Sequence, residues 1–293
     1  MSGLLPAAIP SPSTNGVHVG PFNFHVYGLM YVIGLAVCVA LTVRRWRAQG
    51  GSADLVYEVA LWSFPAGLIG ARIYFDLTTP GDVPDHWWGP FAIWDGGLGV
   101  WGGILAGTLV GAWVVHRRGE SVFAFMDAVA PGLLLAQGIG RLGNWFNQEL
   151  YGRPTSLPWG VEIDPDHRPA RYADRSTFQP TFLYELIWDV ALAIGLIVLG
   201  RRRQIRPPGI FCLYVAGYSA FRIVEELLRV DPSARFLGQR LNLYVASILT
   251  VAGLVGFWVS QRRPAEAAPE DGRPARATSK PPASAASEAS THG

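Results

Sequence analysis

The sequence predicts an all-α polytopic membrane protein with about seven transmembrane helices and a small extracytoplasmic cap. Half of the 293 residues are hydrophobic and only 16% are charged, whereas ordinary soluble domains are ~25% charged. The apolar residues are gathered into runs long enough to cross ~30 Å of hydrocarbon. Short groups of arginine follow every second run, as expected for a chain that crosses a membrane repeatedly.

Hydropathy and helix-breaking residues place the seven spans along the chain. They cover about residues 26–43, 55–77, 91–116, 123–144, 181–200, 209–228 and 242–260. The arginine groups lie at 44–47, 117–118, 201–206 and 262–263. Because such groups stay on the cytoplasmic side, the N-terminus is predicted outside and the C-terminus in the cytoplasm.

Three regions follow from this arrangement. Residues 1–25 form an extracytoplasmic arm without lysine or arginine, which is not typical of a cleavable signal peptide. Residues 26–263 form the seven-helix domain, with the cap at about 145–180, where proline and turn residues replace the apolar runs. Residues 264–293 lack aromatic residues and are predicted to be a disordered cytoplasmic tail.

The most informative segment is 140–152, which reads Gly-Arg-Leu-Gly-Asn-Trp-Phe-Asn-Gln-Glu-Leu-Tyr-Gly directly after an apolar run. A charge near the bilayer centre costs ~2.5–3.5 kcal/mol on insertion scales, and such residues usually mark function. The polar residues are Arg141, Asn144, Asn147 and Glu149. Helical spacing predicts that Arg141, Asn144 and Gln148 share one face.

Further arginines fall at the same predicted level of the membrane. Arg72 lies near the outer end of the second span, and the sixth ends with Arg222, Glu226 and Arg229 at i, i+4 and i+7. Three arginines at one depth, with only two or three acids, predict a site for an external anion, because the guanidinium fork binds phosphate bidentately. The alternative is that the last three residues solvate a helix end. Tyr27 alone is typical of the interfacial aromatic belt.

Segment 140–152 closely resembles the signature of the bacterial prolipoprotein diacylglyceryl transferases, and the resemblance covers nearly all of residues 20–260. The positions that match the family's motifs are Tyr27, Arg141, Asn144, Glu149, Gly152, Tyr184, Glu185, Arg222, Glu226 and Arg229. The resemblance implies transfer of a diacylglyceryl group from phosphatidylglycerol to the lipobox cysteine thiol of a prolipoprotein. Glycerol phosphate is released, and the reaction is the first step of lipoprotein maturation at the bacterial inner or plasma membrane.

We therefore assign candidate roles. The predicted catalytic residues are Arg141, Arg222, Glu149, Tyr27 and Asn144. The predicted phosphatidylglycerol-binding residues are Arg141, Arg222, Arg229, Glu226, Arg72, Asn147 and Gly152. Glu149 is the first choice for general base or for ordering the arginines, with Asp95 after it.

Two departures from the family leave the identity of the catalytic base undecided, because the histidine proposed as that base in many members is absent. Many members carry a histidine before Gly-Gly in the third span, where this chain has Trp101, and many carry His-Pro where it has Gln179-Pro180. Tryptophan cannot accept a proton. Either this chain uses another base, or that histidine is not the base.

The expected partners are phosphatidylglycerol, prolipoprotein signal peptides with a lipobox cysteine, and membrane lipid. No metal or other cofactor is expected, since the histidines and carboxylates lack ligand spacing. No nucleic acid is expected, because the basic residues lie beside apolar segments. The alternative function is a non-catalytic anionic-lipid transporter or lipid-binding membrane protein. Transporters commonly show internal repeats and polar sites at the midplane, whereas these polar residues gather toward the outer interface.

Overall fold

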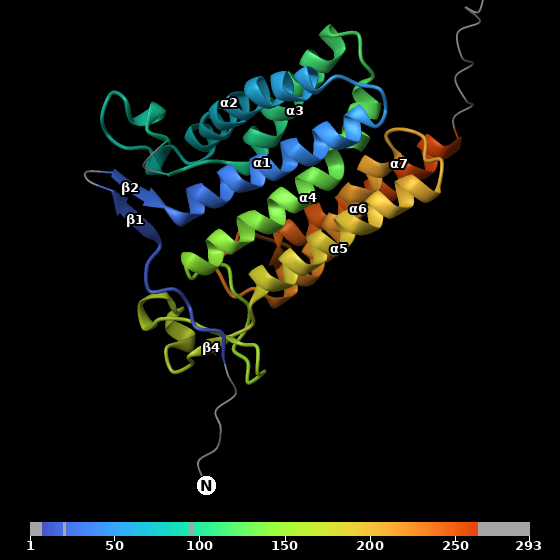
Figure 1. Ribbon diagram of the computed structural model, residues 1–293. Helices are drawn as coiled ribbons and strands as arrows, with labels where there is room; N and C mark the ends of the chain where they lie inside the picture. Colours follow the sequence, from blue (N-terminus) through green and yellow to red (C-terminus); the bar gives the residue numbers. More distant parts are fainter. Residues whose placement is uncertain (1–7, 20–21, 94–95, 263–293) are drawn as a thin grey trace, which may run out of the picture. The chain divides into compact units, whose positions relative to one another are not determined.

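A computed structural model describes residues 8–19, 22–93 and 96–262. Within these ranges the chain forms seven long helices and three two-stranded sheets (Figure 1). The helices are α1 (Val26–Arg47), α2 (Ala53–Thr78), α3 (Val100–Arg117), α4 (Val122–Phe146), α5 (Thr181–Arg202), α6 (Gly209–Leu228) and α7 (Leu241–Arg262). The predicted all-α class is confirmed. The predicted tail at 264–293 lies outside the described residues.

The helices have the length and surface of membrane-spanning elements. α1, α4, α5 and α7 are long and apolar enough to cross a membrane, whereas α2 and α6 each carry several charged residues that lower their mean hydropathy. Large apolar side chains remain more than half exposed along α2, α3 and α7, including Leu61, Leu105 and Ile248. Exposed apolar surface of this extent is typical of helices that contact lipid. The chain is a membrane protein.

Glycine allows α2 and α3 to pack closely along their length. A Cβ added at Gly102 would lie 2.2 Å from the carbonyl oxygen of Gly70, and one added at Gly70 would lie 2.5 Å from that of Gly102. Small residues at such contacts let helix backbones approach in a membrane. α1 and α4 pack in the same way, since a Cβ at Gly132 would lie 2.9 Å from the carbonyl oxygen of Cys38.

Gly102→Leu should therefore destabilise the α2–α3 pair. The added side chain would meet the backbone of Gly70 and the Cβ of Tyr74, neither of which can turn away, and overpacking of this kind costs about 1–3 kcal/mol. Thermal unfolding in detergent should show a lower Tm. Gly195→Leu is the matched control, because nothing lies within 4 Å of a Cβ at that exposed position. Equal Tm values for both variants would show that the α2–α3 contact does not need glycine.

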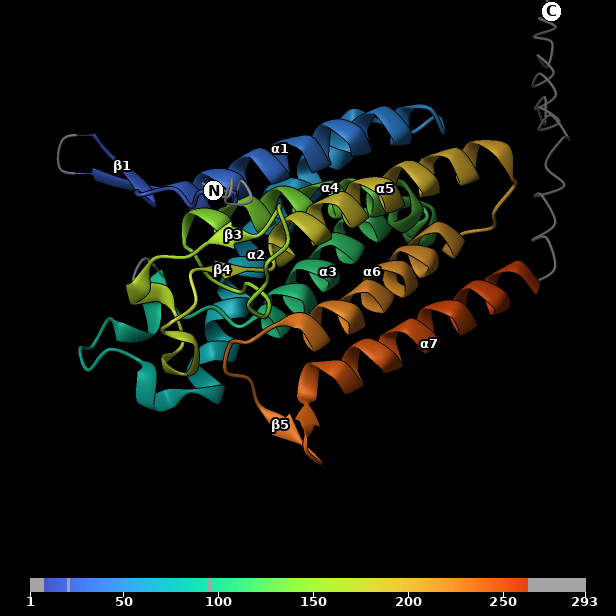
Figure 2. The same ribbon diagram turned by 90° about the horizontal axis from the view of Figure 1, so that it is seen from below.

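Short strands gather at one end of the helices (Figure 1). β1 (Gly16–Val19) pairs with β2 (Phe22–His25), and β3 (Val161–Glu162) pairs with β4 (Thr177–Phe178) in the cap. The arm joins the cap, because Ile9 pairs in parallel with Val161 of β3. β5 (Arg235–Phe236) and β6 (Gln239–Arg240) form a hairpin between α6 and α7 (Figure 2).

The third helix begins later than the sequence predicts. The predicted span opens at about residue 91, but α3 begins at Val100. The 3-10 turn Gly89–Phe91 precedes it, and glycines 96 and 97 have φ values of +89° and +75°. Those values lie in the left-handed region and interrupt an α-helix. An apolar composition alone did not reveal this break.

Candidate functional site

Arg141 is the centre of a polar cluster near the end of α4. Its Nε lies 2.8 Å from Oε2 of Glu185, which is almost completely buried in the second turn of α5. This contact is an ion pair without the direction of a hydrogen bond. Nη1 donates to Oδ1 of Asn144 at 3.4 Å. The other terminal nitrogen, Nη2, donates no hydrogen bond to the residues that the structure describes.

Glu185 connects three helices. Besides Arg141 of α4, it accepts a hydrogen bond at Oε1 from the hydroxyl of Tyr218 in α6, at 3.1 Å. Its Oε2 also lies 3.9 Å from Nη1 of Arg222 in α6. A buried carboxylate needs such partners, because an unpaired charge in this environment is strongly unfavourable. Glu185 therefore fixes the positions of both arginines.

Arg222 is already held by carboxylates on both sides of its fork. Nη1 pairs with Glu225, and Nη2 pairs with Glu226. Both glutamates are buried, and Glu226 also accepts from Nδ2 of Asn242 at 3.2 Å. Arg222 is thus less available to an external anion than Arg141.

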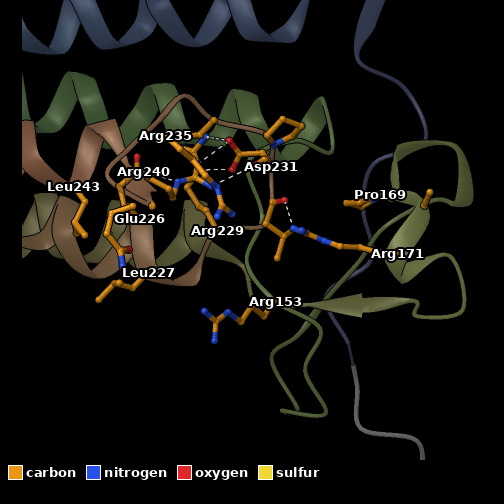
Figure 3. Close-up of a pocket in the computed structure, with 16 residues that line it drawn as sticks. Arg153, Pro169, Arg171, Glu226, Leu227, Arg229, Asp231, Arg235, Arg240 and Leu243 are labelled. Atoms are coloured by element: carbon orange, nitrogen blue, oxygen red, sulfur yellow. Dashed lines mark hydrogen bonds and ion pairs between the residues drawn. The ribbon is translucent and has the colours of Figure 1, made fainter.

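Arg229 does not continue the stripe that the sequence predicts. α6 ends at Leu228, and Arg229 has extended backbone angles. Its Nε and Nη2 donate to the two oxygens of Asp231 at 2.7 and 2.8 Å, and Arg240 donates to the same carboxylate at 3.1 Å (Figure 3). Burial opposes ionisation of Asp231, but the hydrogen bonds and charges of Arg229 and then Arg240 outweigh it and lower the pKa of this carboxyl.

The signature turn closes around Glu149. Asn144 Nδ2 donates to its Oε1 at 2.8 Å, and Asn147 Nδ2 donates to the same oxygen at 3.2 Å. Three of the predicted residues thus form one network with Arg141. Gln148 does not share their face, since α4 ends at Phe146 and Gln148 has φ +52°.

The remaining turn residues connect the helix to the cap. Gln148 instead exchanges hydrogen bonds with Asp164 of the cap at 2.6 and 2.7 Å. Gly152 pairs with Arg229 in an isolated bridge, and a Cβ there would lie 2.9 Å from that of Gln179. Close packing of the chain around position 152 therefore explains why a glycine stands there.

Tyr27 lies beside the same turn of α4. A Cβ added at Gly143 would lie 2.2 Å from its ring, and its hydroxyl lies 3.2 Å from that of Tyr31. Gly143 therefore makes room for an aromatic ring two residues after Arg141.

Arg72 has a different set of partners. Its guanidinium donates to the carbonyls of Gly89, Pro90, Gly96 and Gly97, and it pairs with Asp76 at 3.0 Å. Every nitrogen of its fork is occupied, which corrects the prediction that Arg72 shares one anion site with Arg141. Arg72 fixes the segment before α3 instead. Trp101 lies at the exposed start of that helix, and Asp95 lies outside the described residues.

Sequence reasoning missed several charged residues of the cluster. It named Glu185 as a motif position without a role, and it did not name Glu225, Asp231 or Arg240. The predicted excess of arginine over acid is therefore wrong, because each clustered arginine contacts at least one carboxylate. Glu225 could have been found from its i,i+3 spacing to Arg222, whereas the contact between Arg141 and Glu185 joins distant segments. In the parts of the chain described here, no group of three or more His, Cys, Asp or Glu residues could hold a metal.

Comparisons with known proteins identify the family. Residues 15–259 match the prolipoprotein diacylglyceryl transferase family. A phosphatidylglycerol–prolipoprotein diacylglyceryl transferase of Frankia alni is 48% identical over 266 residues, which cover 87% of this chain and 68% of that protein. Proteins of the same name from Streptomyces coelicolor and Cutibacterium acnes are 44% and 46% identical, and the matches cover 88% and 87% of this chain and 82% and 88% of those proteins. The chain therefore belongs to the prolipoprotein diacylglyceryl transferase family.

Proposed function

We propose that the chain transfers the diacylglyceryl group of phosphatidylglycerol to the thiol of a lipobox cysteine in a prolipoprotein signal peptide. The observation that supports this most is the state of Arg141. Glu185 contacts Arg141 through Nε, and Arg141 lies in the last two turns of α4, which continues into the cap. A guanidinium at this end of the helix can bind the phosphate of a lipid whose acyl chains stay among the helices.

The chemistry needs an external thiol. The chain's own cysteines lie within helices, Cys38 buried and Cys212 half-buried. The precursor thiolate attacks the glycerol carbon that carries the phosphate ester. A C–S bond forms and the C–O bond breaks with its electron pair, so glycerol phosphate leaves and the thiol proton passes to a base.

The arginines act on the phosphate. They bind the phosphodiester before reaction and stabilise the second negative charge that develops on the leaving group, which lowers the barrier only if binding strengthens in the transition state. In this proposal Arg141 makes the principal contact with the phosphate. Arg222, which is paired with two glutamates, contributes positive charge without direct contact. Asn144 and Tyr27 orient the headgroup.

Glu149 is the proposed general base. Only a few per cent of a free thiol with a pKa near ~8.5 is ionised at neutral pH, so a base increases the reactive fraction. Asn144 and Asn147 both donate to Oε1 of Glu149. In this proposal Oε2 of Glu149 takes the proton. The hydrogen bonds to the two asparagines hold the carboxylate near Arg141.

Trp101→Phe should retain substantial turnover. The indole accepts no proton, and its side chain is 45% exposed at the start of α3, so we assign it to packing or lipid contact. The rate of lipidation of a lipobox peptide checks this. A loss as large as that of a catalytic residue would place Trp101 in the mechanism.

The proposed orientation places the cap outside the cell membrane. α1, α3, α5 and α7 all end in arginine, and these ends face the cytoplasm on the positive-inside rule. The cap, the arm and Arg141 then face the side on which precursors emerge. The proposed partners are phosphatidylglycerol, lipobox signal peptides and membrane lipid, without nucleic acid.

Cysteine labelling tests this orientation. In a Cys38→Ala, Cys212→Ala background, a membrane-impermeant maleimide added from outside should modify a cysteine at Asp166 in the cap. It should spare one at Gln204, between α5 and α6, until the membrane is permeabilised. Both positions are exposed. The reverse pattern would contradict the proposed orientation.

The proposed reaction is tested by mass. Purified protein is incubated with phosphatidylglycerol and a lipobox peptide, and the peptide should gain one diacylglyceryl group as glycerol phosphate appears in equal amount. A peptide with serine in place of the lipobox cysteine is the control. Lipid binding without an adduct would support the non-catalytic alternative.

A further inference from the structure

A pocket of about 580 Å³ opens beside the buried cluster. Its walls come from five parts of the chain: the cap, the end of α6, the segment 229–233 that follows it, the β5–β6 hairpin and the first turn of α7 (Figure 3). Most of its lining lies outside the long helices, since only Glu226 and Leu227 of α6 and Leu243 of α7 belong to them. Its occupant can therefore be water-soluble.

The lining carries an excess of positive charge. Five arginines line the pocket, and they are Arg153, Arg171, Arg229, Arg235 and Arg240. Only two acids line it, Glu226 and Asp231, and each is already paired with two arginines.

Two of the arginines are free to bind a ligand. The side chains of Arg153 and Arg235 are exposed and have no hydrogen-bond or ion-pair partner among the residues that the structure describes. Figure 3 shows Arg153 reaching from the cap on the side of the pocket opposite Arg235. Arginine forks suit phosphate, which accepts two parallel hydrogen bonds from each of them.

One carboxylate joins this pocket to the Arg141 cluster. Glu226 pairs through Oε1 with Arg222 and through Oε2 with Arg240. Arg222 lies in turn 3.9 Å from Glu185, the partner of Arg141. The pocket and the Arg141 cluster therefore share one continuous network of ion pairs.

We propose that this pocket is a second anion site, which binds the phosphate of a glycerol phosphate ester. The inference rests on the proposed function. Two sources offer this chemistry: the released glycerol phosphate, and the headgroup of phosphatidylglycerol. A phosphate monoester carries nearly two charges at neutral pH, against one for the phosphodiester of the lipid. A pocket that is open to water and has an excess of arginine therefore favours glycerol phosphate over the lipid headgroup. Binding of glycerol phosphate in the pocket would leave Arg141 available for the next lipid.

Direct binding gives the first test. The full chain in detergent is titrated calorimetrically with glycerol phosphate, without peptide or lipid. Arg153→Gln and Arg235→Gln should each raise Kd about threefold, as expected for one exposed ionic contact, and the double variant should raise it about tenfold. Arg175→Gln is the matched control, an exposed cap arginine outside the pocket, and should leave Kd unchanged. A double variant that binds like the wild type would overturn the proposal.

Kinetics distinguish the two sources. If the pocket takes the product, the double variant raises the inhibition constant of glycerol phosphate about tenfold and leaves the KM for phosphatidylglycerol unchanged. A raised KM with an unchanged inhibition constant would overturn the product assignment and support the lipid headgroup at the same site. Failure of the proposed reaction itself would appear separately, as a wild-type protein that binds glycerol phosphate but adds no lipid to the peptide.

Discussion

Replacing Arg141 by lysine should reduce the rate of transfer about 10²–10³-fold, nearly as much as replacing it by alanine. The reason is that the three nitrogens of the Arg141 guanidinium have different contacts. Nε is committed to Glu185 at 2.8 Å, Nη1 lies 3.4 Å from Asn144, and Nη2 remains open. Lysine has one nitrogen at the end of its chain and cannot contact Glu185 and a phosphate with separate donors.

The two substitutions also differ in their effect on folding. Alanine leaves the buried carboxylate of Glu185 with Arg222 at 3.9 Å as its remaining cation, and breaking a buried pair costs about 3–5 kcal/mol. Lysine keeps a positive charge beside it. The lysine variant should therefore show a Tm near that of the wild type and still be nearly inactive.

The measurement is the initial rate of peptide lipidation, with the Tm of the same preparation. Arg118→Lys is the matched control, because Arg118 pairs with Glu58 on the exposed surface at the opposite end of the helices and should keep full activity. If lysine at 141 restored most of the rate, Arg141 would be a point charge or a structural residue and not a phosphate fork.

The helices were largely predictable, because hydropathy determines what can lie in hydrocarbon. The predicted spans at 123–144 and 209–228 differ little from α4 (Val122–Phe146) and α6 (Gly209–Leu228). The strands were not predicted. They are two to four residues long, and their pairing depends on distant segments, as between Ile9 and Val161.

The site was predictable in its residue types but not in its contacts. Arg141, Asn144 and Glu149 are close in sequence, and the structure joins them in one network. The partner of Arg141 comes from another helix, and no spacing rule relates residue 141 to residue 185. Apparent membrane depth was also misleading, because Arg72 has the depth expected of an anion ligand and contacts backbone carbonyls instead.

Glu149→Gln should lower the rate about 10²–10⁴-fold at neutral pH if Glu149 is the general base. The substitution is nearly isosteric, and the amide oxygen can still accept from Asn144 and Asn147 as the carboxylate does now. The amide cannot take a proton from the thiol. The geometry of the turn is therefore preserved while the proton acceptor is removed.

The pH dependence separates a base from a positioning residue. As pH rises toward ~8.5 the cysteine thiol ionises without help, so a base role predicts that the deficit of Glu149→Gln shrinks with increasing pH. Glu162→Gln, an exposed glutamate of the cap, is the control and should show no deficit at any pH. A deficit of the same size at every pH would mean that Glu149 holds Asn144 against Arg141 without accepting the proton. Full activity would remove Glu149 from the mechanism and leave Glu185, the buried partner of Arg141, as the next carboxylate to replace.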